Sequence, residues 1–201
     1  MIAIIDYGAG NLHSVQNALK YLGAENFVSD DSEKILSADK VILPGVGAFG
    51  DAMAALKEKK LTDTVKTAVE MGKPILGICL GMQLFFDESE ESPGVSGLGI
   101  LKGKFKKIPK ASDIKIPHMG WNSLEMPKPS CILKDIGDEP YVYFVHSYYL
   151  EPENKEDVSA YTTYGQKIAV AAEKDNIFLT QFHPEKSGDI GLKILKNFIE
   201  L

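Results

Sequence analysis

The chain has 201 residues, of which 44% are hydrophobic, with a formal net charge of −6 and a sequence pI near 5.3. This length predicts a single domain over residues 1–201 around one buried core. The acidic balance argues against a nucleic-acid partner bound through its phosphates, and no apolar run approaches the ~20 residues that cross a bilayer. All 22 basic residues are lysine, so anion recognition has to use backbone amides, hydroxyls or lysine rather than a guanidinium fork.

The two cysteines, Cys79 and Cys131, are too few for a disulfide scaffold, and the N-terminal MIAIIDYG lacks the layout of a signal peptide. We therefore expect a cytoplasmic protein with no membrane role. No C-x-x-C pair or H-E-x-x-H motif is present, which disfavours a zinc site. The sequence also lacks a G-x-x-x-x-G-K-S/T loop, and the turn from Gly8 to Asn11 lacks the third glycine of a dinucleotide fingerprint. We expect neither a metal nor a cofactor.

In the first half, short apolar runs alternate with segments of helical period, which predicts a parallel sheet covered by helices. Asn11 is expected to cap a helix that Gly23 ends, and a glycine-rich loop is expected from Pro44 to Gly47. The other expected elements of this half are strands over 2–5, 41–43 and 75–78 and a helix over 61–71.

After Asp87 the composition changes to an acidic stretch and a lysine-rich segment from Lys102 to Lys115, which we interpret as solvated hairpins. Strands are expected over 141–145, 169–172 and 177–182, and a closing amphipathic helix over 190–201. The predicted fold is a flavodoxin-like α/β domain. Its central twisted sheet is mostly parallel, with helices on both faces and additional antiparallel hairpins.

The most informative segment places Cys79 between Gly77 and Gly81, where an apolar strand meets the start of a helix. This pattern indicates a nucleophile elbow, whose sharp turn needs small neighbours and projects the nucleophile above the sheet. The positive end of a helix would also favour the thiolate form. The opposing interpretation is that Cys79 is a small hydrophobic residue of the core.

A cysteine nucleophile needs a base and a group that orients the base. The sequence His183-Pro184-Glu185 offers both, because residues two apart in an extended segment point to the same side. The other histidines lack such a carboxylate partner. For the oxyanion, the amide of Leu80 and a second amide from the Pro44 to Gly47 loop are the candidates.

Together, GICLGMQ at 77–83 and FHPE at 182–185 resemble the class I, triad-type glutamine amidotransferases. Further segments are similar to one branch of this family, the glutaminase subunits of imidazole glycerol phosphate synthases: DYGAGNL at 6–12, LPGVGAF at 43–49, PHMGWN at 117–122 and YFVHSY at 143–148. The resemblance covers essentially the whole chain.

The resemblance implies that Cys79 is the nucleophile, His183 the acid and base, and Glu185 the residue that orients His183. It also implies a set of residues that contact the substrate glutamine: Gln83 and Glu91 through their side chains, and Gly47, Leu80, Ser147 and Tyr148 through their main chain.

The partner implied by the resemblance is a (β/α)₈ cyclase subunit of the same synthase, which uses the released ammonia to form imidazole glycerol phosphate and an aminoimidazole carboxamide ribotide in histidine biosynthesis. The candidate interface residues are Met119, Trp121, Tyr143 and Lys186. Core packing is the opposing interpretation for Met119 and Trp121.

Three other functions stay open at this point. The chain could serve another class I amidotransferase, such as those of anthranilate, guanine nucleotide or pyridoxal phosphate synthesis. It could be a free-standing cysteine hydrolase, which would be active without a partner. It could also be a flavodoxin-like binding module whose cysteine is only structural.

Overall fold

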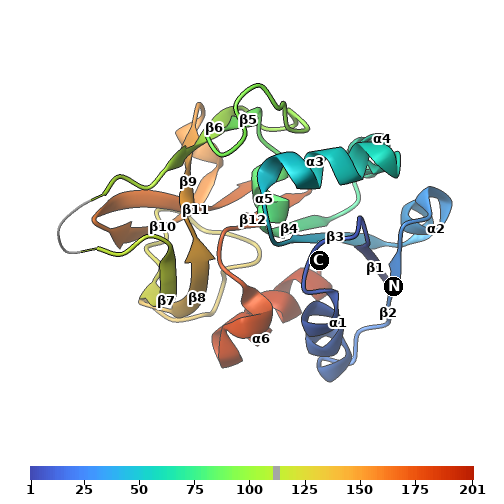
Figure 1. Cartoon of the computed structure of the whole chain (residues 1–201). Coiled ribbons are helices and arrows are strands. Elements are labelled where there is room, and N and C mark those ends of the chain that lie inside the picture. The colour runs from blue at the N-terminus through green and yellow to red at the C-terminus, as the bar shows by residue number, and fades with distance from the viewer. Residues whose placement is uncertain (111–113) are drawn as a thin grey trace.

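The computed structural model describes residues 1–110 and 114–201, and its larger sheet joins a parallel half to an antiparallel half (Figure 1). The parallel half has the strand order β2-β1-β3-β4-β12. This 2-1-3-4-5 type of order is that of flavodoxin-like folds, which bind ligands outside the carboxyl ends of their strands. The bounds of these strands are β1 Ile2–Ile5, β2 Asn26–Ser29, β3 Lys40–Gly45, β4 Ile75–Cys79 and β12 Ile177–Thr180.

The antiparallel half extends from β12 through β11 and β9 to β6, and the short β5 pairs with β6 in parallel at the edge. Strand β10 pairs with β11, and β7 and β8 form a separate two-stranded sheet. The bounds are β5 Glu88–Ser89, β6 Gly103–Lys107, β7 His118–Ser123, β8 Tyr141–His146, β9 Tyr148–Pro152, β10 Val158–Tyr164 and β11 Gln166–Lys174.

Two hydrophobic clusters lie on opposite faces of the parallel half because successive strand side chains alternate in direction. In β1, Ala3 and Ile5 pack in the cluster with α2, α3 and α4, whereas Ile2 and Ile4 pack in the cluster with α1 and α6. The helices are α1 Leu12–Tyr21, α2 Ser32–Ser37, α3 Phe49–Glu58, α4 Leu61–Glu70, α5 Leu80–Leu84 and α6 Gly188–Ile199, with 3₁₀ turns η1 Lys155–Asp157 and η2 Pro184–Lys186. The predicted α/β fold with helices on both faces is therefore confirmed.

Several local expectations need correction. Asn11 occupies the N-cap position of α1, but its side chain makes no capping hydrogen bond. Strand β3 continues through Pro44 and Gly45, which pair with β4, so only the end of the expected loop is loop. Strand β12 stops at Thr180, and the closing helix begins and ends two residues earlier than expected.

The expected hairpins from Lys102 to Lys115 are wrong for the described part of that segment. It contains β6, whose antiparallel partner is the distant β9 rather than a neighbouring turn of chain. The remainder of this expectation, over 111–113, lies outside the described residues. Elements β2, α2 and α3 were not expected at all.

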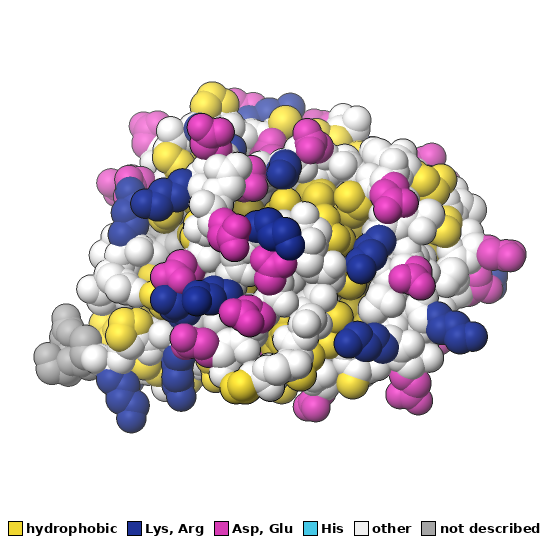
Figure 2. Space-filling model, turned by 90° about the horizontal axis from the view of Figure 1, so that it is seen from above, with side chains coloured by type: hydrophobic (Ala, Val, Ile, Leu, Met, Phe, Trp, Pro, Cys, Tyr) yellow, Lys and Arg dark blue, Asp and Glu magenta, His cyan; other side chains and the backbone are white. Residues whose placement is uncertain are grey.

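Acidic and basic side chains are interspersed over the face seen from above (Figure 2), so this face has no extended field of one sign. Among the described residues, no helix is long and apolar enough to cross a membrane.

Helix α6 fits closely against the turn that follows β12. A Cβ at Gly191 would lie 1.9 Å from the carbonyl oxygen of Pro184 and 2.8 Å from Cβ of Ser187. In an exposed helix Gly→Ala stabilises by up to about 1 kcal/mol, but here we expect Gly191→Ala to lower the free energy of unfolding by about 1 to 3 kcal/mol because it overpacks this contact.

Urea unfolding monitored by circular dichroism measures this change. The control Asp189→Ala, at an exposed position in the same helix, should stay within about 0.5 kcal/mol of the parent. A Gly191→Ala variant more stable than the parent would contradict the close packing.

Candidate active site

Cys79 ends β4 in a strained backbone conformation, with φ 55° and ψ −110°. Glycines stand two positions before and two positions after Cys79 because other chain segments come very close to the backbone there. A Cβ at Gly81 would lie 1.8 Å from the carbonyl oxygen of Leu43, and one at Gly77 would lie 2.7 Å from Cδ2 of Leu179. The expected elbow is therefore present, and the following helix α5 is only five residues long.

His183 and Glu185 lie just beyond the end of the neighbouring strand β12, and both side chains are almost fully buried. Glu185 Oε1 lies 2.8 Å from His183 Nδ1. The expected contact is therefore formed, but the reason given for it is wrong, since residues 184–186 form a 3₁₀ turn rather than an extended segment. Pro184 begins that turn, where its fixed φ is favourable.

Burial alone would lower the pKa of His183, but favourable interactions with Cys79 and Glu185 outweigh it and raise the pKa to about 9. The imidazole cation is therefore favoured when Cys79 is a thiolate. Its buried Nε2 has no hydrogen-bond partner within the described part of the chain. A charged N–H without a partner beside a sulfur atom is suited to giving a proton to a leaving group.

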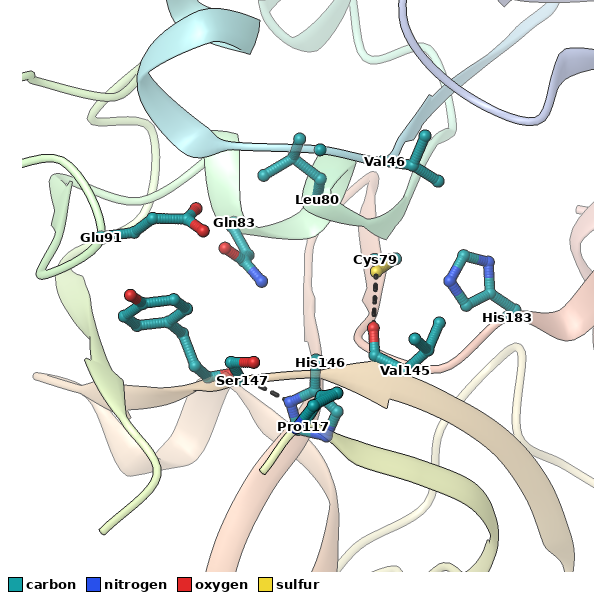
Figure 3. A pocket seen from close by; sticks show the side chains of 12 residues that line it. Val46, Cys79, Leu80, Gln83, Glu91, Pro117, Val145, His146, Ser147 and His183 are labelled. Carbon is teal, nitrogen blue, oxygen red and sulfur yellow. Dashed lines mark hydrogen bonds between the residues drawn. The ribbon is translucent and has the colours of Figure 1, made fainter. Parts of the chain in front are cut away.

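A cavity of about 360 Å³ opens at the carboxyl ends of β3 and β4, and Cys79 faces it between His183 and Gln83 (Figure 3). All six residues expected to contact substrate line it: Gly47, Leu80, Gln83, Glu91, Ser147 and Tyr148. Of the three expected catalytic residues, Cys79 and His183 line the cavity, whereas Glu185 lies behind His183. Within residues 1–110 and 114–201, no three His, Cys, Asp or Glu side chains gather as metal ligands would.

One wall of the cavity is fixed by a cap from a distant segment. Helix α3 begins after Ala48, which cannot cap it, and instead Glu91 Oε2 accepts a hydrogen bond from the Phe49 amide at 2.8 Å. The Ser92 hydroxyl likewise accepts from the Gly50 amide at 2.9 Å. The carboxylate of Glu91 is therefore held in place at the start of α3, which satisfies otherwise unpaired amides.

A buried pair of histidines supports the opposite wall, and the sequence reasoning had set both aside. His146 lines the cavity; its Nδ1 lies 2.8 Å from the carbonyl oxygen of Tyr148, and its Nε2 lies 2.9 Å from His118 Nδ1. The other nitrogen of His118 is 3.3 Å from the amide nitrogen of Asn122. Every ring nitrogen thus has a partner, so the pair holds the backbone around Ser147 rather than exchanging protons.

The candidate interface residues lie on β7, β8 and η2. Met119 and Trp121 are 62% and 56% exposed, so core packing is wrong for both. Trp121 packs edge to face against Tyr143, with ring centroids 6.2 Å apart. Lys186 is exposed at the end of η2, the turn that follows His183. The Tyr143 carbonyl oxygen accepts a hydrogen bond from the His183 amide at 3.0 Å, which joins this exposed strand pair directly to the active-site histidine.

Comparison with known proteins identifies a family over almost the whole chain. The family description "Glutamine amidotransferase class-I" matches residues 3–201. The chain is 53% identical over 198 residues to the imidazole glycerol phosphate synthase subunit HisH of Bacillus cereus (strain G9842), covering 98% of this chain and 93% of that protein.

Two further curated relatives carry the same name. That of Methanothermobacter thermautotrophicus is 52% identical, covering 100% of this chain and 98% of the relative, and that of Chlorobaculum tepidum is 49% identical, covering both chains fully. Among solved structures, a glutamine amidotransferase crystal structure has a TM-score of 0.77 at 21% identity, covering 100% of this chain and 98% of that one. The PurLQS structure from Thermotoga maritima has a TM-score of 0.77 at 20% identity, covering 99% and 97%. These structural likenesses concern the fold alone.

The buried histidine pair predicts acid sensitivity. Burial lowers the pKa of His118 to about 4, and burial, followed by smaller effects of neighbouring histidines, lowers that of His146 to about 3. An unfolded histidine titrates near 6.5, so the unfolded chain binds more protons, and the stability contributed by the neutral pair is complete above pH 6.5 and lost as pH falls toward 4.

We expect His118→Asn, which keeps a donor near Nδ1 but does not titrate, to reduce the loss of unfolding free energy between pH 7 and pH 5 by on the order of 1 to 2 kcal/mol. Urea unfolding at the two pH values measures it, with exposed His13→Asn as the control. An unchanged pH dependence in His118→Asn would contradict the burial argument.

Proposed function

The chain belongs to the class I glutamine amidotransferase family, and we propose that it is the glutaminase subunit of an imidazole glycerol phosphate synthase, with Cys79, His183 and Glu185 as its catalytic residues. The observation that carries the assignment is that Cys79 and His183 face one cavity while Glu185 fixes His183 from behind. The same cavity collects every residue expected to bind glutamine.

In the first step, the thiolate of Cys79 attacks the side-chain carbonyl carbon of glutamine, and the amides near Leu80 and Gly47 stabilise the oxyanion. The imidazolium of His183 then gives its proton to the departing nitrogen, and ammonia leaves as the C–N bond breaks. A γ-glutamyl thioester remains on Cys79.

In the second step, neutral His183 takes a proton from water, whose oxygen attacks the thioester carbon. The C–S bond breaks, glutamate leaves and the thiolate is restored. The sum is glutamine plus water giving glutamate plus ammonia. Glu185 holds His183 Nδ1 throughout, which keeps Nε2 directed at the cavity.

Substrate recognition follows from the cavity lining. The carboxylate of Glu91 suits the substrate α-ammonium, and Gln83 offers an amide oxygen that has no partner within the described residues. The main-chain amides of Ser147 and Tyr148, two residues that line the cavity, suit the substrate carboxylate, a role that falls to backbone because the chain has no arginine.

The partner in this proposal is a (β/α)₈ cyclase subunit that forms a heterodimer with the chain in the cytoplasm. The relatives at about 50% identity are each named as a subunit of a synthase. Ammonia released into water becomes ammonium, which is no nucleophile, so direct delivery to an acceptor subunit is required. Residues 1–201 act in this proposal as one glutamine amidotransferase domain, without a cofactor.

The alternatives are less well supported. The curated relatives reported above all carry the imidazole glycerol phosphate synthase name, not that of another amidotransferase. The strained elbow and the charged, buried histidine argue against a purely structural cysteine.

Glutamate release is the direct test, measured for the purified chain alone and with the cyclase and its nucleotide ligand. We expect the liganded cyclase to stimulate release strongly and Cys79→Ala to abolish it in every mixture, because no other thiol faces the cavity in the described residues. A Cys131→Ala control should keep the parent rate. High activity without the cyclase would indicate a free-standing hydrolase, and activity in Cys79→Ala would refute the assigned nucleophile.

The docking surface is tested separately. Trp121→Ala should weaken binding to the cyclase at least tenfold, because a large exposed aromatic side chain in an interface contributes a disproportionate share of affinity. Isothermal titration calorimetry measures it, with Tyr21→Ala as the matched control, since Tyr21 is 78% exposed on α1. Equal losses for the two variants would place the interface elsewhere.

A further inference from the structure

The side chain of Gln181 contacts the sulfur of Cys79. Gln181 follows β12, is fully buried, and its backbone amide donates to the carbonyl oxygen of Val170. Its side-chain Nε2 lies 3.5 Å from Cys79 Sγ and donates to it. Its Oε1 accepts a hydrogen bond from Gln83 Nε2 at 3.1 Å. One buried amide therefore connects the nucleophile to a residue of the cavity wall.

The hydrogen bonds at the two ends of Gln181 run in the same direction. Gln83 donates to the oxygen of Gln181, so the nitrogen of Gln181 is the end that faces the sulfur. The oxygen of Gln83 is buried and has no partner among the described residues. A buried acceptor of this kind is costly to leave unpaired, and because Gln83 lines the cavity its oxygen is available to a donor group of a ligand there.

The two hydrogen bonds that Sγ makes within the described residues respond oppositely to loss of its proton. The thiol donates to the Val145 carbonyl oxygen at 4.0 Å, a contact that a thiolate cannot make (Figure 3). The donor from Gln181 remains, and a hydrogen bond to an anionic acceptor is stronger than one to a neutral acceptor. Gln181 therefore stabilises the attacking form of Cys79 over the resting thiol.

We propose that Gln181 is a further catalytic residue, whose side-chain N–H stabilises the Cys79 thiolate and whose carbonyl holds Gln83 so that the free Gln83 oxygen binds a donor group of glutamine. This inference rests on the proposed function and deepens it. The buried side-chain amide of Gln181 then links the substrate site to the nucleophile, because its oxygen binds Gln83 and its nitrogen binds Cys79.

The test uses the rate of Cys79 alkylation by iodoacetamide as a function of pH, because the thiolate is the reacting form. The exposed Cys131 would also react, so the experiment is made in a Cys131→Ala background. Gln181→Met keeps the size of the side chain but has no donor. We expect it to move the midpoint of the alkylation profile up by about one pH unit, a tenfold lower thiolate fraction at fixed pH.

The control Gln166→Met makes the same chemical change at the start of β11, in a half-buried residue that does not line the cavity, and should leave the profile unchanged. A purely structural role for Gln181 would lower stability without moving the midpoint. Coincident profiles for folded Gln181→Met and the parent would overturn the proposal.

A second measurement does not require the variant to fold. In the parent chain, the side-chain amide proton of Gln181 should shift downfield by NMR with the same midpoint as alkylation, and this shift should vanish in Cys79→Ala. An amide resonance that does not respond to this titration would overturn the proposal. If Cys79→Ala still hydrolyses glutamine, the proposed function itself fails. If Cys79→Ala is inactive but Gln181→Met keeps the alkylation midpoint of the parent, only the role proposed for Gln181 fails.

Discussion

The close approach of β3, β4 and α5 around Cys79 is the constraint on which the rest of the site depends. The chain at Gly81 passes so near the Leu43 carbonyl that no side chain fits, and the backbone at Cys79, two residues earlier, has a positive φ. Because the adjacent strands are in register, Gly45 lies opposite Cys79 and Ile78 opposite Thr180. Gly47 after β3 and His183 after β12 consequently lie on either side of Cys79 in the cavity, and only short segments separate them from their strands.

His183 and the exposed strand pair, β7 and β8, are also joined by hydrogen bonds. The His183 amide bonds to the Tyr143 carbonyl, and the Ser187 hydroxyl accepts from the Tyr143 amide while donating to the His183 carbonyl. In the proposed complex, a partner that contacts Trp121 and Tyr143 would press on a strand that is hydrogen-bonded to His183. The two backbone hydrogen bonds of Tyr143 would then carry the effect of docking to the proposed catalytic histidine.

Prediction from sequence worked where a local pattern carried the information. Four of the five parallel strands are runs of apolar residues, and the elbow needs glycines that are visible in the sequence, so these strands and the elbow were found. Strand β2 was missed because its four residues are all half-buried and form no apolar run. Helix α3 was missed although Phe49, Ala52, Met53 and Leu56 repeat at helical spacing, since the glycines before it indicated a loop. The β6–β9 pairing joins distant segments, and neither strand alone specifies it.

The same distinction holds within the site. Cys79, His183 and Glu185 could be singled out by residue type and spacing, and the expected contact between His183 and Glu185 is present. Gln181 has no such signal, because a glutamine after a strand is ordinary until its two distant neighbours are known. His118 and His146 were passed over for lack of a carboxylate, but their partners are each other and the backbone.

The cap that Glu91 and Ser92 supply to α3 has a consequence for the order of folding. The first amides of α3 find their acceptors 42 residues further along the chain, so these amides have no protein partner until the two segments have met. The capping that stabilises the start of α3 is therefore non-local, and it forms only when the acidic stretch after β4 has docked. We accordingly expect the start of α3, which borders the cavity, to gain protection from solvent exchange later than the strands of the parallel sheet.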